Sequence, residues 1–141
     1  MRKRVLTGCL LALAACGGDS TSPDPAQAAV GTYALTQVNG KSVPMTYAQD
    51  PLFTVEILNG TMTLRSDLSY TQVINSRTTY NDGTPTRTQT YTENGTFAVS
   101  GGTITFTIPA NGASPAVSYA GVAADGVVTY TLNGDTSRFQ R

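Results

Sequence analysis

The side chains that most often perform catalysis are scarce in this 141-residue sequence. It contains no histidine, and both cysteines, Cys9 and Cys16, fall within the first sixteen residues. These absences exclude a Ser-His-Asp triad, a histidine-based metal site and thiol catalysis in the body of the chain. No glycine-rich segment precedes an expected helix, so no phosphate-binding loop is indicated. We therefore expect a protein that is not an enzyme and that needs no cofactor or metal.

The carboxylates are scattered along the chain, and most of them lie at turn signals. An aspartate in a turn hydrogen-bonds its own backbone, which accounts for most of these residues without catalysis. A carboxylate pair for glycoside hydrolysis is the alternative, and the sequence leaves it open. The residues concerned are Asp50, Glu56, Asp67, Asp82, Glu93, Asp125 and Asp135.

A second set of residues could bind a ligand if the fold brings them to one interior face. Polar groups placed among aromatic rings can orient an amphipathic molecule. Two alternatives compete with this interpretation: the interior is filled by its own side chains, or the central hairpin extends past the domain and its polar groups meet water. The candidate binding residues are Tyr33, Tyr70, Gln72, Tyr91, Phe97, Phe106, Tyr119 and Tyr130, and the polar residues expected to share their face are Gln72, Ser76, Arg87, Gln89 and Glu93.

The elements that must position these residues are expected to be strands. From Gly31 onward no convincing helix is present, and turn signals recur about every eight to twelve residues, which is typical of antiparallel β structure. Asn-Gly, Asp-Gly and Gly-Gly supply the positive φ that tight hairpins need. The expected turns are Asn39-Gly40, Asn59-Gly60, Ser66-Asp67, Asp82-Gly83, Asn94-Gly95, Gly101-Gly102, Asp125-Gly126 and Asn133-Gly134.

These turns predict a register that keeps the apolar residues on one face, and a single wrong register would flip every later side chain. The predicted cross-strand pairs are Ile57–Met62, Val55–Leu64, Leu64–Tyr70, Ile74–Tyr91, Tyr91–Phe97, Val99–Ile104, Phe97–Phe106, Ala123–Val128, Tyr119–Leu132 and Tyr130–Phe139. The predicted face carries Val55, Ile57, Met62, Leu64, Tyr70, Ile74, Tyr91, Phe97, Val99, Ile104, Phe106, Tyr119, Val128, Tyr130, Leu132 and Phe139.

One continuous apolar face favours a sheet that closes on itself, because closure buries that face and removes the edges. We therefore expect an all-β domain: an antiparallel up-and-down meander closed into a small barrel of about 8–10 strands. The segment Lys41–Pro51 does not alternate. It is expected to be a crossover loop, with a lid or a short helix over the barrel mouth as alternatives.

The first sixteen residues resemble a bacterial lipoprotein signal. Arg2-Lys3-Arg4 is followed by an apolar run from Val5 to Ala15, about 16 Å long as a helix and too short for a hydrocarbon core of ~30 Å. Leu13-Ala14-Ala15-Cys16 matches the lipobox, which implies acylation of Cys16 by lipid chains such as palmitate and cleavage just before it. The alternative is an ordinary secretory signal with an incidental cysteine. Gly17, rather than aspartate, in the next position resembles lipoproteins sent to the outer membrane.

Three regions follow from this division of the chain. Residues 1–15 are the expected lipoprotein signal peptide, residues 16–29 the lipidated cysteine and a flexible tether, and residues 30–141 the β-barrel domain. The tether is expected because Gly17–Ala29 is rich in Gly, Ser, Pro and Asp and has no large apolar residue.

The domain resembles the lipocalin-like, calycin-type lipoproteins of bacteria. The resemblance depends on the order of several short β-strand motifs along the chain, and Tyr33 stands where lipocalins have a tryptophan. The motifs are Gly31-Thr32-Tyr33, Val38-Asn39-Gly40, Gly60-Thr61-Met62-Thr63-Leu64 with Asp67 and Tyr70, Gly95-Thr96-Phe97-Ala98-Val99-Ser100-Gly101, Thr103-Ile104-Thr105-Phe106 and Phe139-Gln140-Arg141.

Together these features predict an envelope lipoprotein, held on the outer membrane by lipid on Cys16, whose barrel binds a small apolar or amphipathic ligand. The alternative is an interaction module that engages envelope proteins or glycans through its outer face and loops, with the hairpin Val73–Tyr91 as the contact. Without the signal the chain has six basic and nine acidic residues, a net charge of −3. That balance argues against binding nucleic acid.

Overall fold

The computed structural model describes residues 24–141. The expected signal peptide and Cys16 lie outside these described residues. Within them, no helix combines the length and the apolar character needed to span a membrane. In chain order the elements are α1 (Pro25–Ala29), β1 (Gly31–Val38), β2 (Lys41–Ser42), β3 (Met45–Gln49), β4 (Phe53–Leu64), β5 (Ser69–Tyr80), β6 (Arg87–Ser100), β7 (Thr103–Ile108), β8 (Val117–Ala124), β9 (Val127–Leu132) and β10 (Asp135–Gln140).

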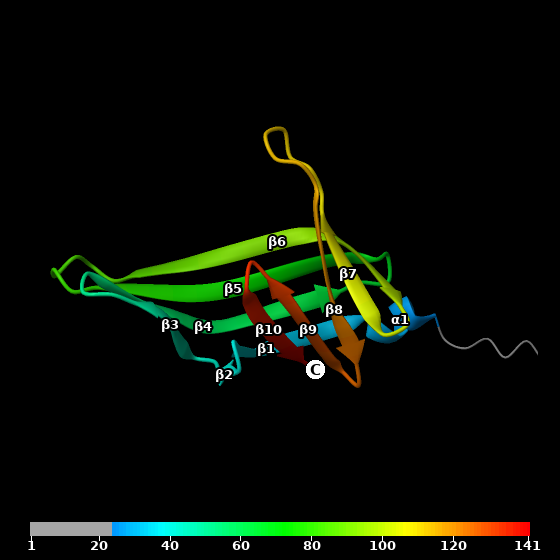
Figure 1. Ribbon diagram of the computed structural model, residues 1–141, viewed down its shortest axis with the longest axis horizontal. Coiled ribbons are helices and arrows are strands. Elements are labelled where there is room, and N and C mark those ends of the chain that lie inside the picture. The colour runs from blue at the N-terminus through cyan, green and yellow to red at the C-terminus, as the bar shows by residue number, and fades with distance from the viewer. Residues whose placement is uncertain (1–23) are drawn as a thin grey trace, which may run out of the picture.

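Eight of the strands form a closed antiparallel barrel, whose strands are labelled in Figure 1. Neighbouring strands run in the order β1-β10-β9-β8-β7-β6-β5-β4, and β1 pairs again with β4, where Tyr33 faces Met62. Strands β2 and β3 lie outside this ring, on β1 and β4. The predicted all-β fold, an antiparallel meander closed into a small barrel, is therefore confirmed.

Alternation along the strands places the core inside the barrel. In β7, Ile104 and Phe106 are fully buried, and in β9 the buried residues are Val128 and Tyr130; the threonines between them point outward. This two-residue period is the pattern that the apolar face requires. The buried core consists of Tyr33, Leu35, Val38, Met62, Leu64, Tyr70, Phe97, Ile104, Phe106, Tyr119, Val128, Tyr130 and Phe139, with Ala26 and Ala29 of α1.

Most of the predicted common face lies in this core or packs against it. Three of its residues, Val55, Ile74 and Tyr91, are outside this set, and Tyr91 is 57% exposed. It faces inward by register, opposite Ile74, but β5 and β6 are 12 and 14 residues long whereas β7 and β9 have only six. The β5–β6 hairpin therefore runs beyond the barrel wall (Figure 1), and Tyr91 lies where the opposite wall ends.

Six of the eight predicted turns are present. The turn between β4 and β5 sets Leu64 opposite Tyr70, as predicted, with Leu68 at φ +64° in the place where a turn glycine is usual. The pairs Ile74–Tyr91, Val99–Ile104, Phe97–Phe106 and Ala123–Val128 are also confirmed.

The turns predicted at Asn59-Gly60 and Asn94-Gly95 are wrong, because both glycines lie inside long strands. They are there for close packing: a Cβ on Gly60 would lie 2.8 Å from the Val73 carbonyl oxygen, and a Cβ on Gly95 would overlap the Thr107 carbonyl oxygen. Glycine inside a strand commonly marks such a close approach. The pairs that depended on these turns, Ile57–Met62, Val55–Leu64 and Tyr91–Phe97, are absent for the same reason.

The pair predicted between Tyr130 and Phe139 is also wrong by two residues. Asn133 and Gly134, both with positive φ, make a two-residue turn, so Tyr130 faces Ser137 and Val128 faces Phe139. Both residues keep the predicted interior face, because a shift of two preserves the side-chain alternation.

Two further segments, Lys41–Pro51 and Pro25–Ala29, differ from the structure predicted for them. Lys41–Pro51, expected to be a crossover loop, forms β2 and β3, and β3 pairs with β4. Pro25–Ala29, assigned to the flexible tether, forms α1, which begins at the Asp24 cap and buries Ala26 and Ala29. Small alanines can pack closely on the barrel end, which offsets the entropy of ordering the segment.

Candidate ligand-binding pocket

A pocket of about 330 Å³ opens at one mouth of the barrel. This mouth pocket lies at the end opposite α1, where the β1–β2 and β9–β10 turns meet the inner face of the projecting β5–β6 hairpin. Its volume is at the small end of the range for small-molecule sites. It is lined by Val38, Tyr47, Ile57, Gln72, Ile74, Ser76, Tyr91, Glu93, Tyr130, Leu132, Asn133, Asp135 and Ser137.

A buried carboxylate, Glu93, lies in the wall of the mouth pocket and is 5% exposed. Its Oε1 accepts hydrogen bonds from the hydroxyls of Tyr70, at 2.7 Å, and Tyr119, at 2.5 Å. The hydroxyl of Tyr91 donates to Oε2 over a longer 3.3 Å. Buried polar groups need such partners, and here hydroxyls from β5, β6 and β8 converge on one side chain.

Burial raises the pKa of the phenols around this carboxylate. Desolvation is the largest cause for Tyr119 and Tyr70, and the negative charge of Glu93 raises the pKa of both further. The pKa of Tyr91 shifts upward for the same two reasons. All three hydroxyls therefore keep their protons near neutral pH and act as donors toward Glu93.

Gln72 and Tyr130 form a second buried polar contact beside the carboxylate. The Tyr130 hydroxyl donates to the Gln72 side-chain oxygen at 2.7 Å across the barrel, from β9 to β5. Burial raises the pKa of Tyr130 to about 12. Gln72 pairs with Glu93 in the β5–β6 ladder, so both side chains point to the same interior face.

The rim of the mouth pocket is organised by Asp135. Its carboxylate accepts hydrogen bonds from Asn39 at 2.8 Å and from the Tyr47 hydroxyl at 2.5 Å. These two bonds hold the pKa of Asp135 below its usual value, the Asn39 contact being the larger cause. The β1–β2 turn, β3 and β10 are thereby tied together around the opening, and Asp135 is ionised at neutral pH.

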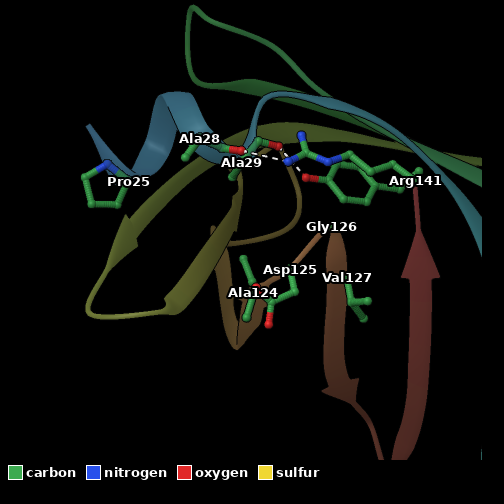
Figure 2. Close-up of a pocket in the computed structure, with 10 residues that line it drawn as sticks. Pro25, Ala28, Ala29, Ala124, Asp125, Gly126, Val127 and Arg141 are labelled. Atoms are coloured by element: carbon green, nitrogen blue, oxygen red, sulfur yellow. Dashed lines mark hydrogen bonds between the residues drawn. The ribbon is translucent and has the colours of Figure 1, made fainter. Parts of the chain in front are cut away.

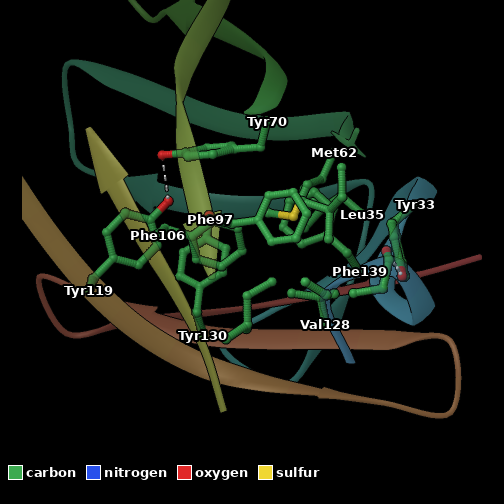
Figure 3. Close-up of a cluster of buried hydrophobic side chains, with 14 of the residues drawn as sticks. Tyr33, Leu35, Met62, Tyr70, Phe97, Phe106, Tyr119, Val128, Tyr130 and Phe139 are labelled. Atoms are coloured by element: carbon green, nitrogen blue, oxygen red, sulfur yellow. Dashed lines mark hydrogen bonds between the residues drawn. The ribbon is translucent and has the colours of Figure 1, made fainter. Parts of the chain in front are cut away.

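Below the mouth pocket the barrel is filled by aromatic rings (Figure 3). Phe106 is central: its ring lies 4.9 Å from that of Tyr70, 5.1 Å from that of Tyr119 and 5.8 Å from that of Tyr130. Tyr130 in turn stacks on Phe139 at 6.1 Å. These edge-on and stacked contacts are favourable ring geometries, and they form a floor that confines the pocket to the mouth.

A larger pocket, of about 520 Å³, lies at the other end between α1 and the β8–β9 turn (Figure 2). Its charged side chains are Asp125 and Arg141, and the guanidinium of Arg141 is already engaged. It donates to the carbonyls of Val30 and Ala28 at 2.9 and 3.2 Å and lies 5.5 Å from the Tyr33 ring centroid. We take the mouth pocket as the candidate site because buried polar groups converge there.

The sequence-predicted site residues divide between the pockets and the filled core. Gln72, Tyr91 and Tyr130 line the mouth pocket. Tyr33 lines the opposite pocket and donates to the Ala29 carbonyl, so it serves the α1 end. The remaining four, Tyr70, Phe97, Phe106 and Tyr119, are buried in the core.

The other polar residues of the predicted face also divide. Glu93 and Ser76 line the mouth pocket, whereas Arg87 and Gln89 lie exposed on the projecting hairpin. Sequence reasoning missed the rim residues Tyr47 and Asp135, because it treated their segments as a crossover loop and a turn. The Asn133-Gly134 signal next to Asp135 does predict that this residue sits at a barrel mouth.

The mouth pocket offers groups that can contact a small molecule. Within residues 24–141, no three His, Cys, Asp or Glu side chains gather as a metal site. Apolar walls, a buried carboxylate and an amide give shape and polarity for recognising a small amphipathic molecule.

Comparisons with protein-family models, with curated proteins and with solved structures find no match. The closed eight-strand antiparallel barrel is consistent with a lipocalin-like fold.

Proposed function

We propose that the protein is a lipid-anchored envelope lipoprotein whose barrel binds a small apolar or amphipathic ligand in the mouth pocket. One observation carries the binding proposal: a pocket of about 330 Å³ combines aliphatic walls with the buried polar pair Gln72 and Glu93. An interior that was filled to its mouth would leave no room for a ligand, and here the aromatic floor stops short of the opening.

Anchoring is supported by the lipobox-like sequence ending at Cys16. Lipid chains on Cys16 would hold the protein at the membrane without a spanning helix. The Gly17 position supports the outer membrane as its destination. Replacing Cys16 with Ala should move the protein from the membrane pellet to the soluble export fraction, and an unchanged distribution would contradict the anchor.

Ligand binding is tested by extracting the protein from its own membranes and identifying small molecules that co-purify, by mass spectrometry. Ile74→Arg places a charge and a longer side chain in the mouth pocket, so the variant should lose any ligand that the parent retains. Val122→Arg is the matched control, because Val122 is 58% exposed on β8 and does not line the pocket. A ligand kept by both variants, or none in the parent, would contradict a mouth-pocket carrier.

A second candidate, an interaction module, is favoured by the free edge of β6. Only Thr96–Ser100 of β6 pairs with β7, whereas β6 begins at Arg87. The part of β6 on the projecting hairpin therefore offers unpaired backbone groups to which a partner strand could add. Shortening the hairpin between Thr78 and Thr88 should abolish capture of an envelope partner if this function is correct, while leaving ligand retention intact.

A further inference from the structure

The mouth pocket is acidic, and its lining among residues 24–141 contains no basic side chain. Glu93 in the wall and Asp135 at the rim are its charged residues among the described part of the chain. The nearest basic residue on the same face of β6 is Arg87, six residues farther along the strand and so about 20 Å away. A ligand that enters this pocket therefore meets negative potential from both the rim and the wall.

Glu93 has acceptor capacity that the protein leaves unused on the pocket side. Tyr70 and Tyr119, which hold Oε1, belong to the core below the pocket. Among the described residues, Oε2 accepts only the 3.3 Å bond from Tyr91, which lines the pocket. A carboxylate can accept about four hydrogen bonds, and within residues 24–141 no lysine or arginine lies within salt-bridge distance of Glu93. A buried charge without a counter-ion is costly unless something else supplies one.

The remaining lining suits an organic cation rather than a bare ion. Tyr47, Tyr91 and Tyr130 line the same pocket, and an ammonium group is attracted to the face of an aromatic ring. Ile57, Ile74 and Leu132 supply apolar surface for a hydrocarbon part. A carboxylate beside aromatic and aliphatic walls thus complements a molecule with a positively charged head group and a hydrocarbon tail.

We propose that the ligand class is a cationic amphiphile, an alkyl amine or a molecule with an equivalent ammonium head. The head donates to Oε2 of Glu93, and the tail lies along Ile57, Ile74 and Leu132. This inference rests on the proposed function, since it names the class of molecule that the same pocket selects.

The test compares three molecules of one chain length that differ only in the head: octylamine, octanol and octanoate. Each is titrated by calorimetry at neutral pH and low salt into the full chain carrying Cys16→Ala, so that no attached lipid competes for the pocket. Octylamine should bind tightest, octanol more weakly and octanoate weakest. Octanol can also donate a hydrogen bond to the carboxylate, so the attraction between the ammonium and Glu93 sets the difference, and octylamine should bind at least about tenfold tighter than octanol.

The variant Glu93→Gln keeps the shape of the side chain and removes its charge. Octylamine should then lose its advantage over octanol, and octanol binding that remains measurable shows that the pocket is intact. Glu56→Gln is the matched control, because Glu56 pairs with Arg77 at 2.8 Å on a surface away from the pocket lining. It should leave the order and the affinities of all three molecules unchanged.

The possible failures separate the two proposals. If none of the three molecules binds the parent protein, the proposed binding function fails, and this inference fails with it. If octanol or octanoate binds as tightly as octylamine, the binding function stands and the cationic class is wrong. An octylamine preference that persists in Glu93→Gln would overturn the role of Glu93, and the parent's ligand order decides the ligand class even if that variant does not fold.

Discussion

Buried tyrosines make the stability of this barrel sensitive to alkaline pH. Tyr70, Tyr119 and Tyr130 are at most 8% exposed, and burial is the leading cause that raises the pKa of each above 10.0. A raised folded-state pKa means that the native state holds the proton more tightly than the unfolded chain. The associated stability is therefore fully present below pH 10 and is lost as the pH rises through the folded-state pKa values.

The size of the effect follows from the number of protons involved. Above pH 10 the unfolded chain releases three protons that the native barrel keeps, and each contributes about 1.4 kcal/mol per pH unit. The free energy of unfolding should therefore fall by a slope that approaches about 4 kcal/mol per pH unit. For Tyr130, whose pKa rises from 10.0 to about 12, the loss extends to about pH 12 and amounts to roughly 3 kcal/mol. Because small domains have a total free energy of unfolding of about 5–15 kcal/mol, the barrel should unfold between about pH 10 and pH 12.

Urea unfolding followed by circular dichroism, repeated at intervals from pH 8 upward, measures this slope. Tyr130→Phe should reduce the slope by about 1.4 kcal/mol per pH unit because it removes one of the protons. Val128→Ala, a fully buried neighbour in β9, is the matched control: it should lower stability by about 2 kcal/mol at every pH and leave the slope unchanged. A parent protein whose stability is flat above pH 10 would refute the reasoning.

Two further perturbations test the packing of the barrel ends and wall. Gly95→Ala should lower the free energy of unfolding by at least about 3 kcal/mol, because the new methyl group meets the Thr107 carbonyl and the Tyr70 ring. Gly102→Ala, at φ +80° with open space around it, should lower it by only about 1 kcal/mol. Equal losses of stability in urea unfolding would contradict the close packing at Gly95. Arg141→Ala removes the hydrogen bonds to the Ala28 and Val30 carbonyls. Amide hydrogen exchange in α1 should therefore accelerate, while exchange in β7 should not. Unchanged protection of the Ala28 amide would show that Arg141 does not hold the helix.

The fold could be predicted from the sequence because local sequence patterns specify its strands and turns. The Leu64–Tyr70 register follows from one turn, and the alternation of Ile104 and Phe106 with threonines marks the buried face without reference to distant residues. The hairpin turns predicted at Asn59-Gly60 and Asn94-Gly95 were wrong because contacts between distant residues decide the structure there. Asn-Gly is a strong hairpin signal in isolation, and only the folded sheet reveals that a backbone carbonyl packs over each glycine.

The site was less predictable because it depends on how the barrel closes. The sequence places Glu93 and Gln72 on the interior face, but it does not indicate that Tyr119, 26 residues away, reaches the same carboxylate. Tyr91 was expected inside and is exposed, since the relative lengths of β6 and β7 decide where the wall ends. The rim contact between Tyr47 and Asp135 spans 88 residues and arises only once β3 has added to the sheet.

The most direct test of a mouth pocket above a filled core is an NMR titration with octanol, which needs no assumption about the charge of the ligand. Methyl signals of Ile57, Ile74 and Leu132 should shift and saturate together, while those of Met62, Ile104 and Val128, in the filled part of the barrel, should stay unchanged. Saturable shifts confined to the outer face, or no saturable shifts at all, would contradict the account.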